Sequence, residues 1–241
     1  MARYCGFEKF GQAVLDAAMD RAEIGVSVRE RLSRVAGIIK LPVPTLDAFI
    51  LRDFLNEPQC EALIKMITLN RKPSRLFAQS LDPNFRTSET CNLDPKHTLV
   101  QEVEASLTML LGIEPKYGEY LQGQRYEVGQ QYKPHFDCLY PSEPYWPQQE
   151  KIGGQRTWTA MTFLNVPQQG GETFFKRIGV KITPRRGSLV TWNNLDARGD
   201  PNAHSLHQGM PVLAGVKYII TKWYRERPWA DRSRDHKAPL G

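Results

Sequence analysis

Hydrophobic residues in the first half of the chain recur at steps of three and four, which is the spacing of one face of an α-helix. Residues 7–34 follow this spacing and are expected to form one or two amphipathic helices, and residues 95–111 are expected to form another. Asn56 and Gln59 precede a further apolar stripe, and their spacing predicts a capping box at the start of a helix.

After Gly118 the pattern changes to short stretches with a period of two, separated by Gly, Pro and Asn. Strands are expected over residues 119–128, 131–138, 155–166, 172–176, 187–192, 203–207 and 216–224, with a shorter strand at 48–51. Residues 41–44 are expected to be extended, and residues 71–92 irregular. Helices followed by many short strands favour an α+β chain with a closed or double-sheet β core, most typically a jelly roll.

The same change of pattern divides the chain into three parts. Residues 1–40 are expected to be an N-terminal helical extension, 41–228 a single large domain with its β core at about 115–226, and 229–241 a charged C-terminal tail. A chain of 241 residues is long enough for one such domain with a well-buried core.

Composition narrows the function classes. The net charge is +6 and the pI is about 9.1, but the basic residues are scattered and interleaved with acidic ones, so no nucleic-acid partner is expected. No apolar run is long enough for a membrane span, and the first twenty residues lack the hydrophobic region of a secretory signal. A cytoplasmic location is therefore expected, with four separate cysteines as reduced thiols rather than a disulfide framework or zinc site.

Candidate chemistry begins with His135-Phe136-Asp137. An imidazole and a carboxylate two residues apart on a strand point to the same side and can occupy adjacent positions on a metal ion. A second imidazole would complete one face of the metal and leave the other open. His204 and His207 are both candidates for it.

Lys217 is the second candidate group. On the strand expected at 216–224 it shares one face with Ile219, Thr221 and Trp223, and both faces of that strand are largely apolar. A lysine buried there needs an anion beside it, and a ligand carboxylate is an economical partner. The alternative is that Lys217 lies on an edge strand and extends its ammonium group into solvent.

Five segments of the chain carry a family resemblance. They are 125–137, 153–156, 170–173, 205–207 and 215–223, and His207 lies ten positions before Lys217 in them. Together they resemble the prolyl 4-hydroxylase branch of the Fe(II)- and 2-oxoglutarate-dependent dioxygenases. The resemblance covers about residues 86–225. It implies a double-stranded β-helix (jelly-roll, cupin-like) core supported by N-terminal helices. It also implies that residues 41–228 are the dioxygenase domain.

The resemblance also implies roles for individual residues. His135, Asp137 and His207, rather than His204, become the ligands of Fe(II), and Lys217 becomes the partner of the distal carboxylate of 2-oxoglutarate. The residues implied around this cofactor are Tyr132, Thr173 and Tyr126, and those implied near the substrate are Arg156, Arg86 and Trp223. Three metal positions remain, two for the chelating keto acid and one for O2, with ascorbate as an expected reductant.

The expected reaction is hydroxylation of a prolyl residue in a peptide or protein, with decarboxylation of 2-oxoglutarate to succinate. Residues 140–147 form an aromatic and proline-rich loop, which either closes over an extended chain or packs its own aromatic side chains. Two alternatives stay open: the same chemistry on a free amino acid or another small molecule, and a cupin-like metal-binding module without catalytic activity. The oligomeric state has no signature in the chain.

Overall fold

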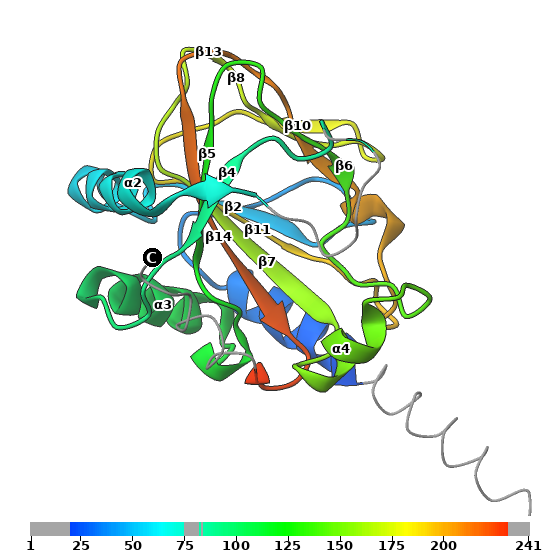
Figure 1. Ribbon diagram of the computed structural model, residues 1–241. Helices are drawn as coiled ribbons and strands as arrows, with labels where there is room; N and C mark the ends of the chain where they lie inside the picture. Colours follow the sequence, from blue (N-terminus) through cyan, green and yellow to red (C-terminus); the bar gives the residue numbers. More distant parts are fainter. Residues whose placement is uncertain (1–19, 75–81, 83, 231–241) are drawn as a thin grey trace, which may run out of the picture.

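The computed structural model describes residues 20–74, 82 and 84–230. The major sheet has eight strands in the order β1-β2-β11-β7-β14-β5-β4-β3 (Figure 1). Their bounds are β1 Ile38–Lys40, β2 Ala48–Leu51, β3 Lys72–Pro73, β4 Glu89–Asn92, β5 Gln122–Tyr126, β7 Arg156–Phe163, β11 Leu189–Asn193 and β14 Lys217–Arg225.

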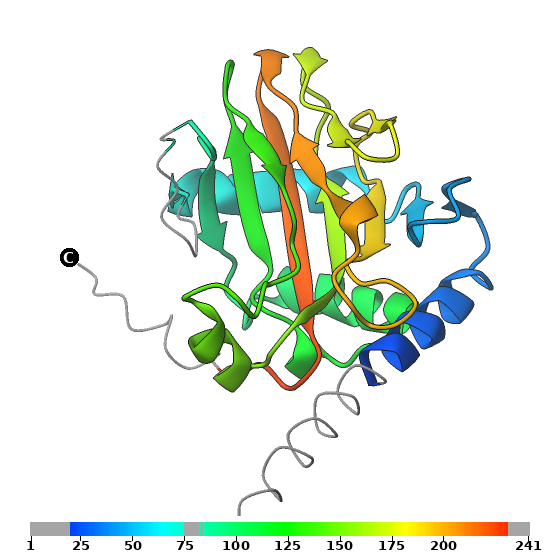
Figure 2. The same cartoon turned by 90° about the vertical axis from the view of Figure 1, so that its right-hand side faces the viewer.

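A minor sheet faces this one, with four strands in the order β10-β9-β12-β6. Their bounds are β6 Tyr132–His135, β9 Thr173–Phe175, β10 Val180–Ile182 and β12 His207–Gly209, while β8 Gln169–Gly170 pairs separately with β13 Val212–Ala214. All of these strand pairs are antiparallel. Figure 2 shows the minor sheet in front of the major sheet, with the helices behind, and this confirms the expected α+β jelly-roll class.

The helices cover the face of the major sheet that is turned away from the minor sheet (Figures 1 and 2). They are α2 Glu57–Asn70, α3 Thr98–Leu111 and the N-terminal helix, which is described over residues 20–32. The short helices are α4 Trp146–Lys151 and the 3-10 turns η1 Pro115–Tyr117 and η2 Ala203–Ser205. In the described part of the chain, each helix is too short or too polar to span a lipid bilayer.

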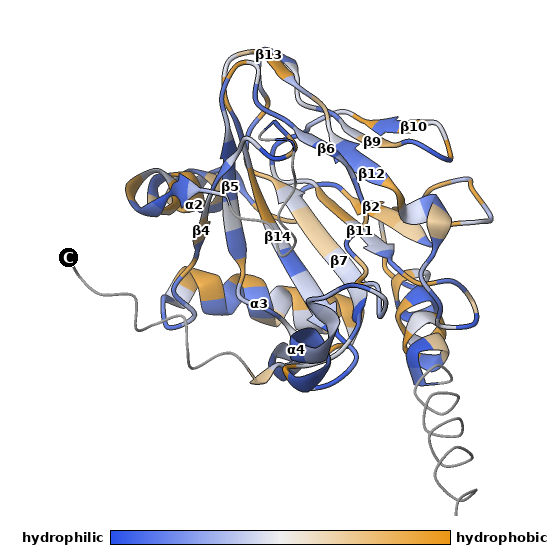
Figure 3. Cartoon of the chain, turned by 45° about the vertical axis from the view of Figure 1, so that its right-hand side comes forward, coloured by the Kyte–Doolittle hydropathy of each residue, from blue (hydrophilic) through white to orange (hydrophobic). Residues whose placement is uncertain are grey.

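Two hydrophobic cores lie on opposite faces of the major sheet. One packs Val28, Leu63 and Leu107 of the helices against Trp158 and Ile220 of the sheet. The second lies between the two sheets and includes Met161, Phe163, Phe175, Trp192 and Ile219. Figure 3 shows the alternation of hydrophobic and hydrophilic residues in α3 that the first core requires. Strand β7 is buried at every position because both cores contact it.

The helix starts follow from capping. Asn56 Oδ1 accepts a hydrogen bond from Gln59 N at 2.9 Å, and Gln59 Oε1 accepts one from Asn56 N at 3.0 Å, which confirms the predicted capping box. Helix α3 begins at Thr98 rather than at residue 95, because His97 caps it: the Nδ1 of His97 accepts a hydrogen bond from Leu99 N at 3.2 Å.

Some expected elements differ in the structure. The strand expected at 203–207 is wrong: Asn202 caps a 3-10 turn there, and β12 starts only at His207. The expected irregular stretch 71–92 contains β3 and β4, whose polar, partly exposed residues hide the alternation. The other expected strands are present. β2 matches residues 48–51, β11 and β14 begin later and end one residue further than expected, and the rest are shorter at both ends. Residues 7–19 of the expected helix and 231–241 of the expected tail lie outside the described residues, and the three-part division of the chain stays a prediction.

Candidate functional site

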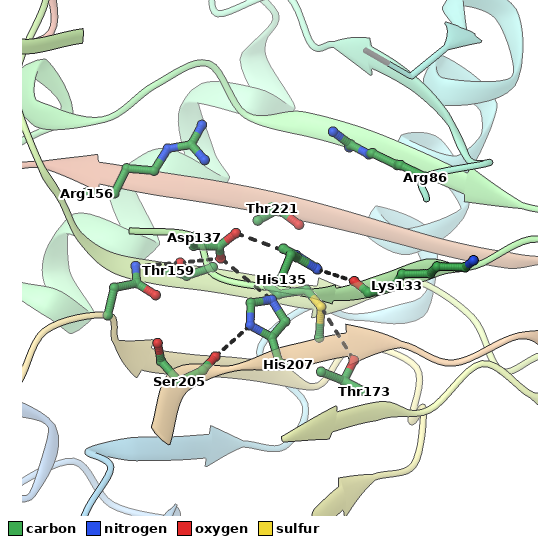
Figure 4. Close-up of polar contacts among 12 residues, drawn as sticks. Arg86, Lys133, His135, Asp137, Arg156, Thr159, Thr173, Ser205, His207 and Thr221 are labelled. Atoms are coloured by element: carbon green, nitrogen blue, oxygen red, sulfur yellow. Dashed lines mark hydrogen bonds and ion pairs between the residues drawn. The ribbon is translucent and has the colours of Figure 1, made fainter. Parts of the chain in front are cut away.

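Three side chains from two neighbouring strands converge in the space between the sheets. His135 ends β6, Asp137 follows it, and His207 begins β12, where it pairs directly with His135. Asp137 Oδ1 lies 3.8 Å from His135 Nε2, and Asp137 Oδ2 lies 3.8 Å from His207 Nε2 (Figure 4). Ligand atoms of all three lie within 4.8 Å of one another, the separation expected around a single metal ion.

The backbone and a second layer of side chains hold these three residues in place. Nδ1 of His135 lies 2.8 Å from Lys133 O, and Nδ1 of His207 lies 2.9 Å from Ser205 O. Each Nδ1–H therefore donates to a carbonyl and leaves Nε2 as a lone-pair donor toward the common centre. Thr159 Oγ1 donates to Asp137 Oδ2 at 2.8 Å. Two imidazole nitrogens and a carboxylate on one face fit a ferrous ion with open positions.

Electrostatics favour the ligand forms of these groups. Burial and the neighbouring His207 lower the pKa of His135 to about 3, so this imidazole is neutral at physiological pH. Burial alone would raise the pKa of Asp137, but His207, His135 and Arg156 outweigh it and hold that pKa below its ordinary value. The cluster is thus a neutral imidazole and an ionised carboxylate before any metal is considered.

Lys217 lies in the same cavity and has no counterion in the described residues. It is 1% exposed, and its Nζ lies 5.3 Å from the ring centre of Tyr126 and 5.4 Å from that of Phe163. Burial lowers the pKa of Lys217 to about 7, and Glu172 offsets only part of that effect. The alternative of a solvent-exposed edge position is therefore wrong, because β14 is a central strand.

Most of the expected site residues line one cavity between the sheets. Its lining includes the three ligand candidates and Lys217, together with Tyr126, Tyr132, Thr173 and Trp223. Tyr132 stacks on His135 with ring centres 3.4 Å apart. The Trp223 indole Nε1–H is buried and has no hydrogen-bond partner among the described residues.

The two arginines expected near the substrate lie beside the cavity rather than in its lining (Figure 4). Arg156 forms a two-point ion pair with Glu119, at 2.6 and 2.7 Å, and its guanidinium lies 4.3 Å from the ring centre of Trp223. Arg86 donates to Gln122 Oε1 at 2.9 Å and lies 4.8 Å from the ring centre of Tyr132. Both therefore position aromatic walls of the cavity.

His204 does not join the ligand group within the described residues. It lies inside η2, and its backbone N–H donates to Asn202 Oδ1. The 3-10 turn places His207, two residues after Ser205, at the start of β12, where strand pairing directs it toward His135.

Several cavity residues were not predicted. Gln124 joins two walls, because it accepts from Tyr126 OH at 2.7 Å and donates to Thr221 Oγ1 at 3.1 Å. Thr221 was expected on the same strand face as Lys217, although no role in the site was assigned to it. Gln124 and Thr159 had no such signal, because their positions depend on pairing between distant strands.

Gln155 also had no signal, and it holds the backbone that follows Asp137. Strand β6 ends at His135, so β6 contributes no strand-to-strand backbone hydrogen bonds at residue 139. Gln155, 2% exposed, accepts from Leu139 N and donates to Leu139 O, both at 2.6 Å. The side-chain amide thus replaces a pair of backbone hydrogen bonds two residues after the ligand.

The loop after Leu139 is attached to the major sheet at its far end. Gln149 of α4 accepts from Arg225 NH2 at 2.7 Å, and Gly154 O accepts from Arg225 NH1 at 2.6 Å. Arg225 Nε lies 2.6 Å from Glu119 Oε1, so Glu119 bridges Arg225 and Arg156. The loop therefore begins and ends on fixed points near the site.

Comparison with known proteins places this geometry in a family. Residues 121–225 match the family described as the 2OG-Fe(II) oxygenase superfamily. Probable prolyl 4-hydroxylase 8 of Arabidopsis thaliana is 32% identical over an alignment covering 73% of this chain and 68% of the relative. Prolyl 4-hydroxylase 13 of the same plant is 26% identical, with 94% of this chain and 90% of the relative covered.

One solved structure has a similar fold and a related sequence. It is the viral collagen prolyl hydroxylase of Paramecium Bursaria Chlorella virus-1 in its 2OG complex. The two chains superpose with a TM-score of 0.59 and 26% sequence identity, over 74% of this chain and 95% of the viral one.

Proposed function

The chain belongs to the prolyl 4-hydroxylase branch of the Fe(II)- and 2-oxoglutarate-dependent dioxygenases, and on that premise we propose that it hydroxylates a prolyl residue within a peptide or protein. The observation that carries the proposal is the cavity itself. It holds a two-histidine, one-carboxylate face at one point and, at another, an ammonium group with no counterion among the described residues. A metal site that is only structural has no use for such an ammonium group.

Each residue has a distinct task in this reaction. When bound, Fe(II) with 2-oxoglutarate and O2 supplies oxidative decarboxylation to succinate and hydroxylation of a substrate C–H bond. His135, Asp137 and His207 hold the metal on one face. Lys217 binds the distal carboxylate of the keto acid, and the walls formed by Ile219 and Trp192 exclude water around it.

Thr173 and Tyr126 are proposed to assist Lys217, and Tyr132 to fix the ring of His135. Thr173 and Tyr126 line the cavity around the Lys217 end, and the Oγ1 of Thr173 makes only a long contact of 3.8 Å to the sulfur of Met161. This weak contact leaves the hydroxyl free to donate to a carboxylate. The Tyr126 hydroxyl already donates to Gln124, so its role is positional.

A peptide is the proposed substrate because aromatic surface suited to one borders the cavity. The Trp223 ring lines the cavity, and the Arg156 guanidinium lies 4.3 Å from the centre of that ring. Phe136 and Tyr140 form an edge-to-face pair at 5.8 Å on the adjoining loop. Aromatic surfaces are typical of sites that bind extended, proline-rich chains, and the viral relative is named a collagen prolyl hydroxylase.

The test is succinate formation dependent on substrate. Wild-type protein with Fe(II), 2-oxoglutarate and proline-rich peptides is expected to form succinate and hydroxyproline, while free proline or lysine is expected to give no turnover above background. Asp137→Ala is expected to abolish metal binding and turnover together because it removes the only anionic ligand of the set. Turnover of free amino acids without peptide turnover would transfer the proposal to a small-molecule substrate.

Two finer expectations stay predictions. Ascorbate is proposed as the reductant that restores Fe(II) after turnover without substrate, and omission of ascorbate is expected to shorten the period of linear turnover. The cytoplasmic location is supported by the free, buried thiols of Cys60, Cys91 and Cys138, which suit a reducing compartment. Fractionation of cells that express the full chain would test it.

A further inference from the structure

The hairpin of β9 and β10 carries three basic side chains and no acidic one between its first and last residues. Lys176, Arg177 and Lys181 are exposed, and none of them has an ion-pair partner among the described residues. Lys181 contacts Phe174, with its Nζ 5.5 Å from the ring centre. Within residues 20–74, 82 and 84–230, no carboxylate therefore neutralises this charge by an ion pair.

Strand pairing shows where the hairpin lies along the cavity. Thr173 pairs with Gly209 and Phe175 with His207, so β9 runs past the ligand cluster from one end of the cavity to the other. The Thr173 end is the cofactor end, because a Cβ on Gly209 would lie 3.9 Å from Lys217 Nζ. Lys176 and Arg177 lie in the turn that directly follows Phe175, on the side of His207 opposite to Thr173.

This opposite end is where the aromatic loop lies. Lys176 N donates to Leu206 O at 2.9 Å, which fixes the turn that follows β9 beside β12. Burial raises the pKa of Tyr140, and the nearby positive charge of Arg177 lowers that pKa by a smaller amount. Arg177 is therefore near the loop that packs Tyr140 against Phe136.

The acidic residues around this end do not cancel the charge. Glu119 is shared by Arg156 and Arg225, and Asp82 is paired with Lys133 at 2.6 Å. Glu143 lies on the loop near Tyr145, whose pKa it raises together with the larger effect of burial. Neither Glu143 nor Glu150, the second exposed carboxylate of this loop, forms an ion pair with Lys176 or Arg177 among the described residues.

We propose that Lys176 and Arg177 form a cationic rim at the substrate end of the cavity, and that this rim selects peptides with acidic residues beside the target proline. The inference rests on the proposed prolyl hydroxylation and adds the charge class of the substrate. A chain whose proline reaches the metal would pass between the aromatic loop and this turn, so its flanking side chains meet the two cations.

The expected size of the effect is modest and depends on salt. Exposed charge pairs are worth about two- to fivefold each in affinity. Replacing a favourable pair by an unfavourable one is therefore expected to change the specificity constant by about tenfold at low salt. Because the screening length is about 8 Å at physiological ionic strength, the preference should shrink as salt is added.

The test uses one proline-rich host peptide with Glu, Gln or Lys on both sides of the target proline. Wild-type protein is expected to show a kcat/KM about tenfold higher for the Glu peptide than for the Lys peptide. Arg177→Glu is expected to reduce this ratio to about one or invert it, with the KM for 2-oxoglutarate unchanged. Lys65→Glu is the matched control, since it changes net charge equally on the exposed side of α2.

Each outcome bears on the proposal. Equal kcat/KM for the three peptides, or a preference for Lys, would overturn the rim, as would an identical shift in Lys65→Glu. If no peptide is hydroxylated at all, the proposed function fails, and the rim is then judged by fluorescence anisotropy of the same three peptides carrying a dye. Tighter binding of the Glu peptide that is lost in Arg177→Glu supports it; equal binding refutes it.

Discussion

Two lysines five positions apart on β14 show how differently the two faces of one strand treat a buried charge. Lys217 and Lys222 are each 1% exposed. Lys222 points to the helical layer, where it forms an ion pair with Glu104 of α3. Lys217 points into the space between the sheets, where no described carboxylate pairs with it and burial lowers its pKa to about 7.

The contrast separates a structural charge from a functional one. A buried cation that the protein neutralises itself needs no ligand, and its removal should affect stability. A buried cation that the protein leaves without a counterion destabilises the free protein, and it becomes favourable only when an anion arrives. Lys222, on the helical face of β14, is the neutralised cation, and Lys217, on the cavity face, is the cation without a described counterion.

The largest expected effect is on stability, at the helical face. Glu104→Ala removes the carboxylate from Lys222 in a dry interior, which should lower the free energy of unfolding by about 3–5 kcal/mol. For a domain of this size that corresponds to a fall of about 6–20 °C in Tm. The double variant Glu104→Leu/Lys222→Met should recover most of the loss in thermal unfolding. An unchanged Tm in Glu104→Ala would show that the ion pair of Lys222 with Glu104 is not structural, and the contrast with Lys217 would fail.

The next effect is on cofactor affinity, at the cavity face. Lys217→Met keeps the length of the side chain and removes the ammonium, so 2-oxoglutarate should bind about 30-fold more weakly or worse, a loss of at least about 2 kcal/mol. The Tm of the ligand-free protein should stay the same or rise, because an uncompensated charge is gone. Titration calorimetry with 2-oxoglutarate measures the first quantity, and wild-type affinity in this variant would refute the assignment of Lys217.

A smaller effect is expected where an amide, rather than a charge, supports the site. Gln155→Leu removes the two hydrogen bonds to Leu139, so the backbone after Asp137 should loosen and metal affinity should fall about 10- to 100-fold. Fe(II) or Co(II) titration followed by absorbance measures it. Asn165→Leu removes two partly buried hydrogen bonds to the backbone of Val216 and Tyr218 and none to the metal-ligand segments, so it is the control for general destabilisation and should bind metal normally.

The smallest effect is the pH dependence of cofactor binding. Lys217 with a pKa of about 7 is cationic below that pH and becomes neutral above it, while both carboxylates of 2-oxoglutarate stay ionised. Affinity should therefore fall about threefold between pH 6.5 and pH 7.5 and about tenfold per unit at higher pH. Lys217→Arg, whose guanidinium stays charged, should give a flat profile over this range. A flat wild-type profile would contradict the lowered pKa.

The face of β14 was predictable from alternation alone. Lys217, Ile219, Thr221 and Trp223 were expected on one face, and all four line the cavity. The convergence of His135 and Asp137 was predictable in kind from their spacing, although β6 ends at His135 and Asp137 lies just beyond it. The capping box of α2 followed from local chemistry between neighbouring residues.

What failed depended on contacts between distant segments. The pairing of Lys222 with Glu104 joins residues more than a hundred positions apart, and nothing in either neighbourhood indicates that α3 packs there. Gln124, Thr159 and Gln155 reach the site through the register of β5 and β7, and register has no local signature. The 3-10 turn before His207 was missed because the side chain of Asn202, rather than hydrophobic spacing, stabilises it.

The double burial of β7 has a consequence for how this protein can diversify. Every position on that strand packs against a core, so changes beneath the metal would be opposed by loss of folding free energy. The turn after β9 and the loop after Leu139 are less constrained, because residues such as Lys176, Arg177 and Glu143 are exposed. New substrates could therefore be acquired by altering these margins alone, with the reaction centre inherited intact.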